Sequence, residues 1–214
     1  MTEVKETGGA RIGMANATWP FATLTVNREK LQLNATILGN LVFKPTDIIS
    51  IIPYSGFMSS GLKINHTVSK YKDNVVFWTF GSPTEIIKKI EQTGFLTNRT
   101  PVTAELAESI TKVQSQGGFP LKRTAVIAIV VIWNLLFLID FQNFFEGNKA
   151  GSPLGLGAQL ALGFILLTCI LLLTLEPVRR LILKEGRNIE DIKKFIFFIM
   201  FICGFMLLAT ILTH

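Results

Sequence analysis

Three long apolar runs in the C-terminal half of this 214-residue chain constrain its fold most strongly. They cover residues 121–141, 156–175 and 192–212. A helix of about 20 residues rises about 30 Å, which matches the hydrocarbon core of a bilayer. Buried helices of soluble proteins are seldom so long and so uniformly apolar. We therefore predict three transmembrane helices over 121–214 and exclude a wholly soluble enzyme.

Composition limits what else the chain can contain. Only 17% of its residues are charged, and the net charge of +6 is shared equally between residues 1–118 and 119–214. This even distribution gives no basic stripe, so we expect no nucleic-acid partner. The two cysteines, Cys169 and Cys203, lie in the apolar runs, which excludes a disulfide scaffold. One modest soluble domain can precede the membrane region.

Lysine and arginine residues predict the orientation of the helices. The loop between the second and third runs is rich in them, whereas Lys149 is alone in the loop between the first and second. Lys122 and Arg123 lie at the start of the first run. The positive-inside rule then places the N-terminal half in the cytoplasm and His214 outside. The first ten residues contain no apolar core of a signal peptide, which favours the same orientation.

The N-terminal half shows the alternation typical of β-strands. Short runs in which apolar and polar residues alternate follow one another between residues 18 and 80, separated by turn residues. This pattern predicts a series of short antiparallel strands joined by hairpins. Residues 1–10 hold acidic side chains and two glycines, and we predict a flexible tail there.

A helix is predicted directly after the last strand. The sequence at 82–85, Ser-Pro-Thr-Glu, matches a capping box with proline at the first helical position. Gly94 supplies a C-terminal stop. Ile86, Ile87 and Ile90 share one face of this helix, and we expect that face to cover the apolar side of the strands.

The order of these elements resembles the pleckstrin-homology-like barrel, in its bacterial PH and GRAM-like form. The closest stretches are Gly61–His66, Val75–Phe80 and the helix that ends at Gly94. The resemblance implies an α+β membrane protein: a PH-like antiparallel β-barrel over 11–98, capped by a helix. A helical linker over 99–120 then leads to the three transmembrane helices.

The resemblance also implies a function. It suggests a non-enzymatic binding or scaffolding domain at a bacterial cytoplasmic membrane, with membrane lipids and an unidentified protein as partners. In eukaryotic members a basic hairpin binds phosphoinositides, but the first hairpin here departs from that pattern because Glu29 separates Arg28 from Lys30. We instead consider seven other cations as anionic-lipid contacts, namely Lys63, Lys70, Lys72, Arg179, Arg180, Lys184 and Arg187.

Catalytic and metal-binding patterns are missing from the N-terminal half of the sequence. His66 is its only histidine, and it contains no cysteine. Zinc coordination and a histidine-activated nucleophile therefore lack the residues they need. His66 lies within a strand alternation, which favours a packed histidine. We expect neither a catalytic site, nor a metal site, nor a cofactor.

Small and polar residues of the apolar runs suggest how the helices pack. Gly157 and Ala161 lie one turn apart with Gly163 nearby, a spacing that allows close helix contact. These residues either form the interface of a homo-oligomer or contact other helices of the same chain. Asn134 is a further candidate for helix packing. An alternative hypothesis makes the chain an accessory subunit of a transporter or envelope complex, with Asn134 or Glu176 in a substrate path.

Overall fold

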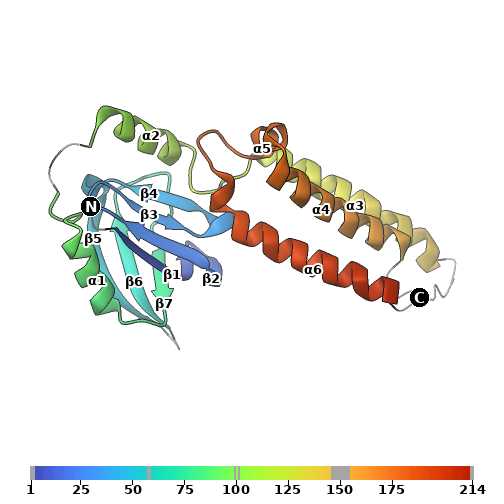
Figure 1. Ribbon diagram of the computed structural model, residues 1–214, viewed down its shortest axis with the longest axis horizontal. Helices are drawn as coiled ribbons and strands as arrows, with labels where there is room; N and C mark the ends of the chain where they lie inside the picture. Colours follow the sequence, from blue (N-terminus) through green and yellow to red (C-terminus); the bar gives the residue numbers. More distant parts are fainter. Residues whose placement is uncertain (1–2, 57–58, 99, 101, 146–154, 213–214) are drawn as a thin grey trace. The chain divides into compact units, whose positions relative to one another are not determined.

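The computed structural model describes residues 3–56, 59–98, 100, 102–145 and 155–212. Its described part is an α+β protein with one seven-stranded antiparallel sheet, curled into a half-barrel, and six α-helices (Figure 1). The chain divides into two compact units. The β unit comprises Met1–Pro120 and Gly186–Asp191, and the helical unit comprises Leu121–Glu185 and Ile192–His214. A six-residue segment between two parts of the helical unit thus belongs to the β unit.

The strands of the β unit follow the order β4-β3-β2-β1-β7-β6-β5. Their bounds are β1 Val4–Ile12, β2 Ala15–Val26, β3 Leu31–Asn34, β4 Asn40–Phe43, β5 Ile48–Gly56, β6 Ser59–His66 and β7 Val75–Thr79. The predicted alternation of apolar and polar residues corresponds to an alternation of burial in the strands. Residues such as Leu24, Leu33 and Phe77 are fully buried in one core. The antiparallel strands predicted from the sequence are confirmed.

The prediction of a flexible tail over residues 1–10 was wrong for the described residues from Val4 onward. They form β1, which lies between β2 and β7 in the sheet. The glycines that suggested flexibility serve close packing instead. A Cβ atom on Gly8 would lie 2.2 Å from the carbonyl oxygen of Trp78, and one on Gly9 would lie 2.2 Å from the Trp78 ring. Glycine is needed at both positions because neither leaves room for a side chain.

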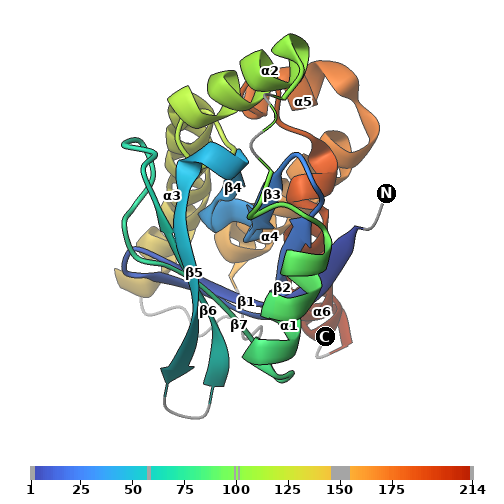
Figure 2. The ribbon, with the colours of Figure 1, turned by 90° about the vertical axis from the view of Figure 1, so that its left-hand side faces the viewer.

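The predicted helix after the last strand is α1, Pro83–Gln92. Pro83 occupies the first turn, and Gly94 ends the helix with a φ of +72°. The helix α1 lies against the sheet (Figure 2). Its Ile86 and Ile90 are buried in the core, whereas Ile87 is only partly buried. The Ser82 side chain makes no capping hydrogen bond, so the predicted capping box does not form.

The segment predicted as a linker over 99–120 is an integral part of the β unit. Its helix α2, Ala104–Ser115, packs against β4. Ile110 and Gln114 on this helix are buried. The expected domain boundary at residue 98 therefore moves to Pro120, because burial of these side chains joins α2 to the sheet.

The helical unit contains α3 Arg123–Phe145, α4 Leu156–Thr174, the short α5 Glu176–Ile182 and α6 Lys193–Leu212. Among the described residues, α3, α4 and α6 are long and apolar enough to cross a membrane. Their spans of 18 or 19 residues agree with the three apolar runs of the sequence. A membrane protein with three candidate spans is therefore the architecture that the helices support.

Close packing of α3 against α4 explains the glycine at position 157. A Cβ atom there would lie 2.4 Å from the carbonyl oxygen of Leu136 on α3. The Asp140 carboxylate of α3 accepts hydrogen bonds from the backbone N–H groups of Gly157 at 2.8 Å and Ala158 at 2.7 Å. It thereby caps the N-terminus of α4. The face of α4 that carries Gly157 thus contacts α3 of the same chain.

The neighbouring small residues differ in their surroundings. Ala161 is buried, whereas a Cβ atom on Gly163 would meet no atom of the described chain within 4 Å. Gly163 is therefore not part of this close contact. Self-association through α4 stays a prediction, and the Gly157 side of the helix already faces α3.

We expect Gly157→Leu to destabilise the helical unit by about 1–3 kcal/mol, because the leucine side chain forces the α3 and α4 backbones apart. Gly163→Leu is the matched control, since its side chain enters open space. The thermal unfolding of both full-length variants in detergent would measure the difference. Equal melting temperatures would contradict the proposed helix contact.

Candidate functional site

The outward backbone groups of Asn40 and Val42, at the outer edge of β4, all have hydrogen-bond partners. β4 is a terminal strand of the sheet, and such a strand has backbone groups without strand partners. Here the outward N–H of Asn40 donates to the carbonyl oxygen of Gly118 at 2.9 Å. The N–H of Val42 donates to the Tyr71 hydroxyl at 3.3 Å. Burial raises the pKa of Tyr71, so the phenol stays neutral in this position.

Side chains from distant parts of the chain satisfy the two outward carbonyl groups of β4. The Asn40 carbonyl oxygen accepts a hydrogen bond from Arg187 Nη1 at 2.8 Å. The Val42 carbonyl oxygen accepts one from Gln114 Nε2 at 2.9 Å. The edge is therefore closed without a further strand, and its closure depends on residue 187, which follows α5 in the sequence.

Arg187 connects β4 to the end of α2. Its side chain is 8% exposed. Besides Asn40, it donates through Nη2 to the carbonyl oxygens of Gly117 at 2.6 Å and Val113 at 3.4 Å. A cation at these carbonyls stabilises the C-terminus of a helix. Burial lowers the pKa of Arg187, yet a guanidinium group remains charged in proteins.

Gln114 makes a second connection between α2 and the sheet. Its Nε2 donates both to Val42 and to the Asp47 carboxylate, the latter at 2.7 Å. The same carboxylate accepts the backbone N–H of Lys44 at 2.8 Å. Two buried polar side chains, Gln114 and Arg187, thus hold α2 against β4.

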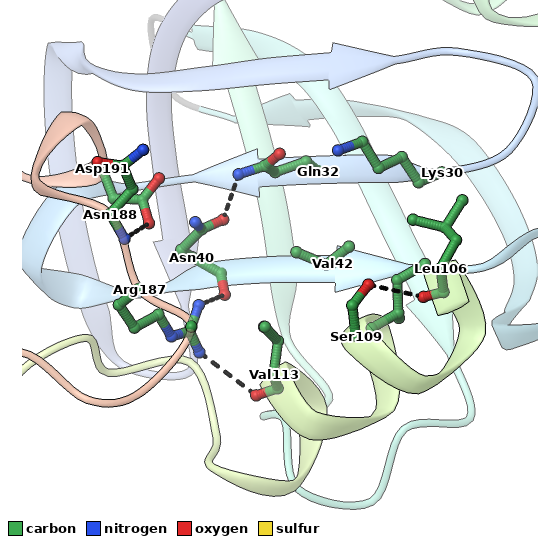
Figure 3. Close-up of a pocket in the computed structure, with 12 residues that line it drawn as sticks. Lys30, Gln32, Asn40, Val42, Leu106, Ser109, Val113, Arg187, Asn188 and Asp191 are labelled. Carbon is green, nitrogen blue, oxygen red and sulfur yellow. Dashed lines mark hydrogen bonds between the residues drawn. The ribbon is translucent and has the colours of Figure 1, made fainter. Parts of the chain in front are cut away.

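A pocket of about 380 Å³ lies beside this closed edge (Figure 3). β3 and β4 form one wall, α2 forms another, and the segment 186–191 closes one end. Lys30 and Gln32 line the sheet side, and Asn188 and Asp191 line the end. The apolar part of the lining includes Val42, Leu106, Ile110 and Val113.

The lining can form hydrogen bonds and charge contacts with a ligand. Lys30 supplies a cation and Asp191 a carboxylate, while the Gln32 amide donates to Asn40 Oδ1 at 2.9 Å. The Ser109 hydroxyl donates to the Leu106 carbonyl oxygen at 2.8 Å. The lining contains neither histidine nor cysteine, and no metal-binding cluster occurs in the described part of the chain. This arrangement suits recognition of a polar ligand or peptide.

The structure assigns different roles to the arginines predicted to contact lipid. The prediction for Arg187 is corrected, because its guanidinium is buried on β4 and α2 and is not accessible to lipid. Arg179 donates to the carbonyl oxygens of Leu172 and Leu173 at the end of α4. Arg180 forms an exposed ion pair with Glu176 at 2.6 Å.

The lysines predicted to contact lipid remain at the surface to different degrees. Lys70 and Lys72 are exposed in the turn between β6 and β7, and Lys63 is half-buried on β6. Lys184, in the segment before Arg187, is also half-buried.

Two other residues singled out in the sequence have local partners. His66 packs against Phe43, with 5.1 Å between ring centroids, as expected for a packed histidine. Its Nε2 lies 3.1 Å from the carbonyl oxygen of Lys72. The Asn134 side chain donates to the carbonyl oxygen of Val130 on its own helix at 2.7 Å. The described residues show no hydrogen bond from Asn134 to another helix.

Sequence reasoning missed Asn40, Tyr71, Gln114 and the structural role of Arg187. Gln114 lies 72 residues from Val42, and Arg187 lies 147 residues from Asn40. No local periodicity connects positions so far apart. The chain matches no protein-family model, no curated protein and no solved structure.

Proposed function

We propose that this chain is a membrane-anchored binding protein whose PH-like β unit recognises a partner at the pocket beside β4. The proposal is based on one observation: part of the pocket wall comes from a segment far along the sequence from the strands of the β unit. The segment 186–191, which follows the second candidate span, supplies Arg187, Asn188 and Asp191 to a pocket otherwise built by β3, β4 and α2. Partner recognition is thereby linked to the loop between two spans.

Two features support the PH-like assignment. The half-barrel is a single curled antiparallel sheet. Its last strand is followed by α1, which inserts Ile86 and Ile90 into the core. These features agree with the barrel and closing helix of the family that the sequence resembles. The resemblance supports a non-enzymatic scaffolding role, and the hydrogen-bonding side chains of the pocket are suited to binding a partner.

We further propose a bacterial cytoplasmic membrane, with the β unit in the cytoplasm and the C-terminus outside. Asn40 precedes the first span in the sequence, and Arg187 follows the second. The hydrogen bond between these two residues supports a topology in which both lie on the same side of the membrane. This agrees with the cation-rich loop at 179–194 and the positive-inside rule. The third span then carries the C-terminus across.

The transporter alternative receives less support from the contacts. Asn134 bonds to its own helix, and Glu176 pairs with Arg180 outside the span of α4. Both polar groups are thus engaged locally. The binding function is therefore the one that we propose.

Photocrosslinking in native membranes tests the proposed binding function. A benzophenone amino acid at Ser109, which lines the pocket, should give an adduct of one defined mass. The same amino acid at Glu108, an exposed neighbour on α2 that is not part of the lining, is the control. Lys30→Glu reverses the charge of the wall and should abolish the Ser109 adduct. Identical adducts at both positions, or none at Ser109, would refute recognition at this pocket.

A further inference from the structure

An aromatic cluster lies on the sheet surface opposite the core. Trp19 is on β2, Trp78 is on β7, and Phe80 directly follows β7. The Phe80 ring centroid lies 6.2 Å from that of Trp19 and 6.3 Å from that of Trp78. The strands β2, β1 and β7 are neighbours in the sheet (Figure 2). The cluster therefore extends across three strands of one face, which we call the aromatic face.

Large parts of these aromatic side chains are accessible. Trp19 is 50% exposed and Phe80 is 79% exposed. Trp78 lies over Gly9 of β1, where any larger residue would overlap its ring. Exposed tryptophan and phenylalanine side chains grouped in this way mark a surface that contacts an apolar or interfacial medium.

Cations border the aromatic face. Arg11 on β1 and Lys63 on β6 both pair in register with Val76 of β7, two residues before Trp78. Side chains of paired residues lie on the same side of a sheet. Arg11 and Lys63 therefore project on the same side as Trp78, one from each neighbouring strand.

Carboxylates are rare on the same strands. β2, β5, β6 and β7 contain neither aspartate nor glutamate. The only acidic residue of β1 is Glu6, which is paired with Lys89 of α1 at 2.7 Å. These strands thus contribute the cations Arg11 and Lys63 near the aromatic cluster and, besides the paired Glu6, no carboxylate.

We propose that the aromatic face binds the surface of an anionic bilayer. Tryptophan rings favour the depth of the lipid headgroups, where one edge is apolar and the other is hydrated. Lysine and arginine side chains nearby are attracted by anionic headgroups. The candidate spans of the same chain keep the β unit at high effective concentration near lipid. Charge complementarity selects this occupant over an uncharged protein surface. The proposal does not depend on partner recognition at the β4 pocket.

Fluorescence quenching of the full-length protein in lipid nanodiscs tests this proposal. The chain has three tryptophans, and the third, Trp133, lies in α3. A Trp133→Phe background leaves the emission of Trp19 and Trp78. Phosphatidylglycerol brominated near the headgroup end of its acyl chains should quench this emission. Brominated phosphatidylcholine should quench it much less.

Charge-reversal variants then distinguish binding of the aromatic face to lipid from quenching that arises only because the β unit is tethered near the bilayer. Lys63→Glu should lower the ratio of lipid-bound to unbound β unit at least about fivefold. Lys88→Glu, on the exposed side of α1, makes the same change away from the aromatic face and should leave quenching unaltered. About 1 M salt, which shortens the Debye length to about 3 Å, should weaken quenching without any substitution.

Three results would overturn the proposal. The first is emission that neither brominated lipid quenches, including emission shifted to the blue by a covering protein. The second is equal quenching by both lipids, because the cations would then have no role. The third is an equal effect of Lys63→Glu and Lys88→Glu.

Discussion

Arg187→Met is expected to lower the free energy of unfolding of the β unit by about 3 kcal/mol or more. The substitution keeps much of the apolar stem but removes the donors to Asn40 and Gly117. Hydrogen bonds from charged groups contribute about 1.5–3 kcal/mol each, and the abandoned carbonyl oxygens remain buried. Loss of the cation also leaves the C-terminal carbonyls of α2 without their cap.

Hydrogen exchange of the full-length protein would locate this effect. We expect faster exchange in the peptides that cover β4 and α2, because Arg187 joins these two elements. Arg180→Met is the matched control: Arg180 lies on α5, in the same connection between the second and third candidate spans, but its side chain is 78% exposed in an ion pair with Glu176. Exposed pairs of this type contribute about 0–1 kcal/mol. Similar exchange and unfolding in the two variants would contradict a structural role for Arg187.

Ile90→Asp should abolish cooperative unfolding of the β unit. Ile90 is fully buried between α1 and the sheet. Truncating a buried isoleucine costs about 2–5 kcal/mol, and an unpaired carboxylate in its place adds a desolvation penalty. Their sum is comparable to the whole stability of a domain, about 5–15 kcal/mol.

Ile87→Asp provides the comparison for this prediction. Ile87 is only partly buried, so its carboxylate can reach water and the variant should retain a transition. Urea unfolding followed by Trp19 and Trp78 emission in the Trp133→Phe background would measure both variants. A cooperative transition near the wild-type midpoint in Ile90→Asp would show that α1 does not close the core.

The elements that the sequence predicts best are those with a local signature. The spans of α3, α4 and α6 follow from the length of three apolar runs. The alternation of β3 and the proline and glycine that delimit α1 also depend on neighbouring residues alone. Each of these signals lies within a single segment of the chain.

β1 shows where local patterns fail. Its glycines weaken the strand signal, and their purpose is apparent only when Trp78 lies against them. Gly157 is similar, because its spacing indicates a helix contact but not which helix makes it. Leu136 and Asp140 of α3 identify that partner.

Length, hydropathy and residue spacing by themselves determined that this chain holds a strand-rich unit followed by three candidate membrane helices. Tertiary structure alone decided that the unit is completed by residues 186–191 and that Arg187 is buried rather than accessible to lipid. The physical reason is that the role of a buried polar side chain depends on which hydrogen-bond partners surround it. For Arg187 these are the carbonyl oxygens of Asn40, Val113 and Gly117, which only folding brings within reach.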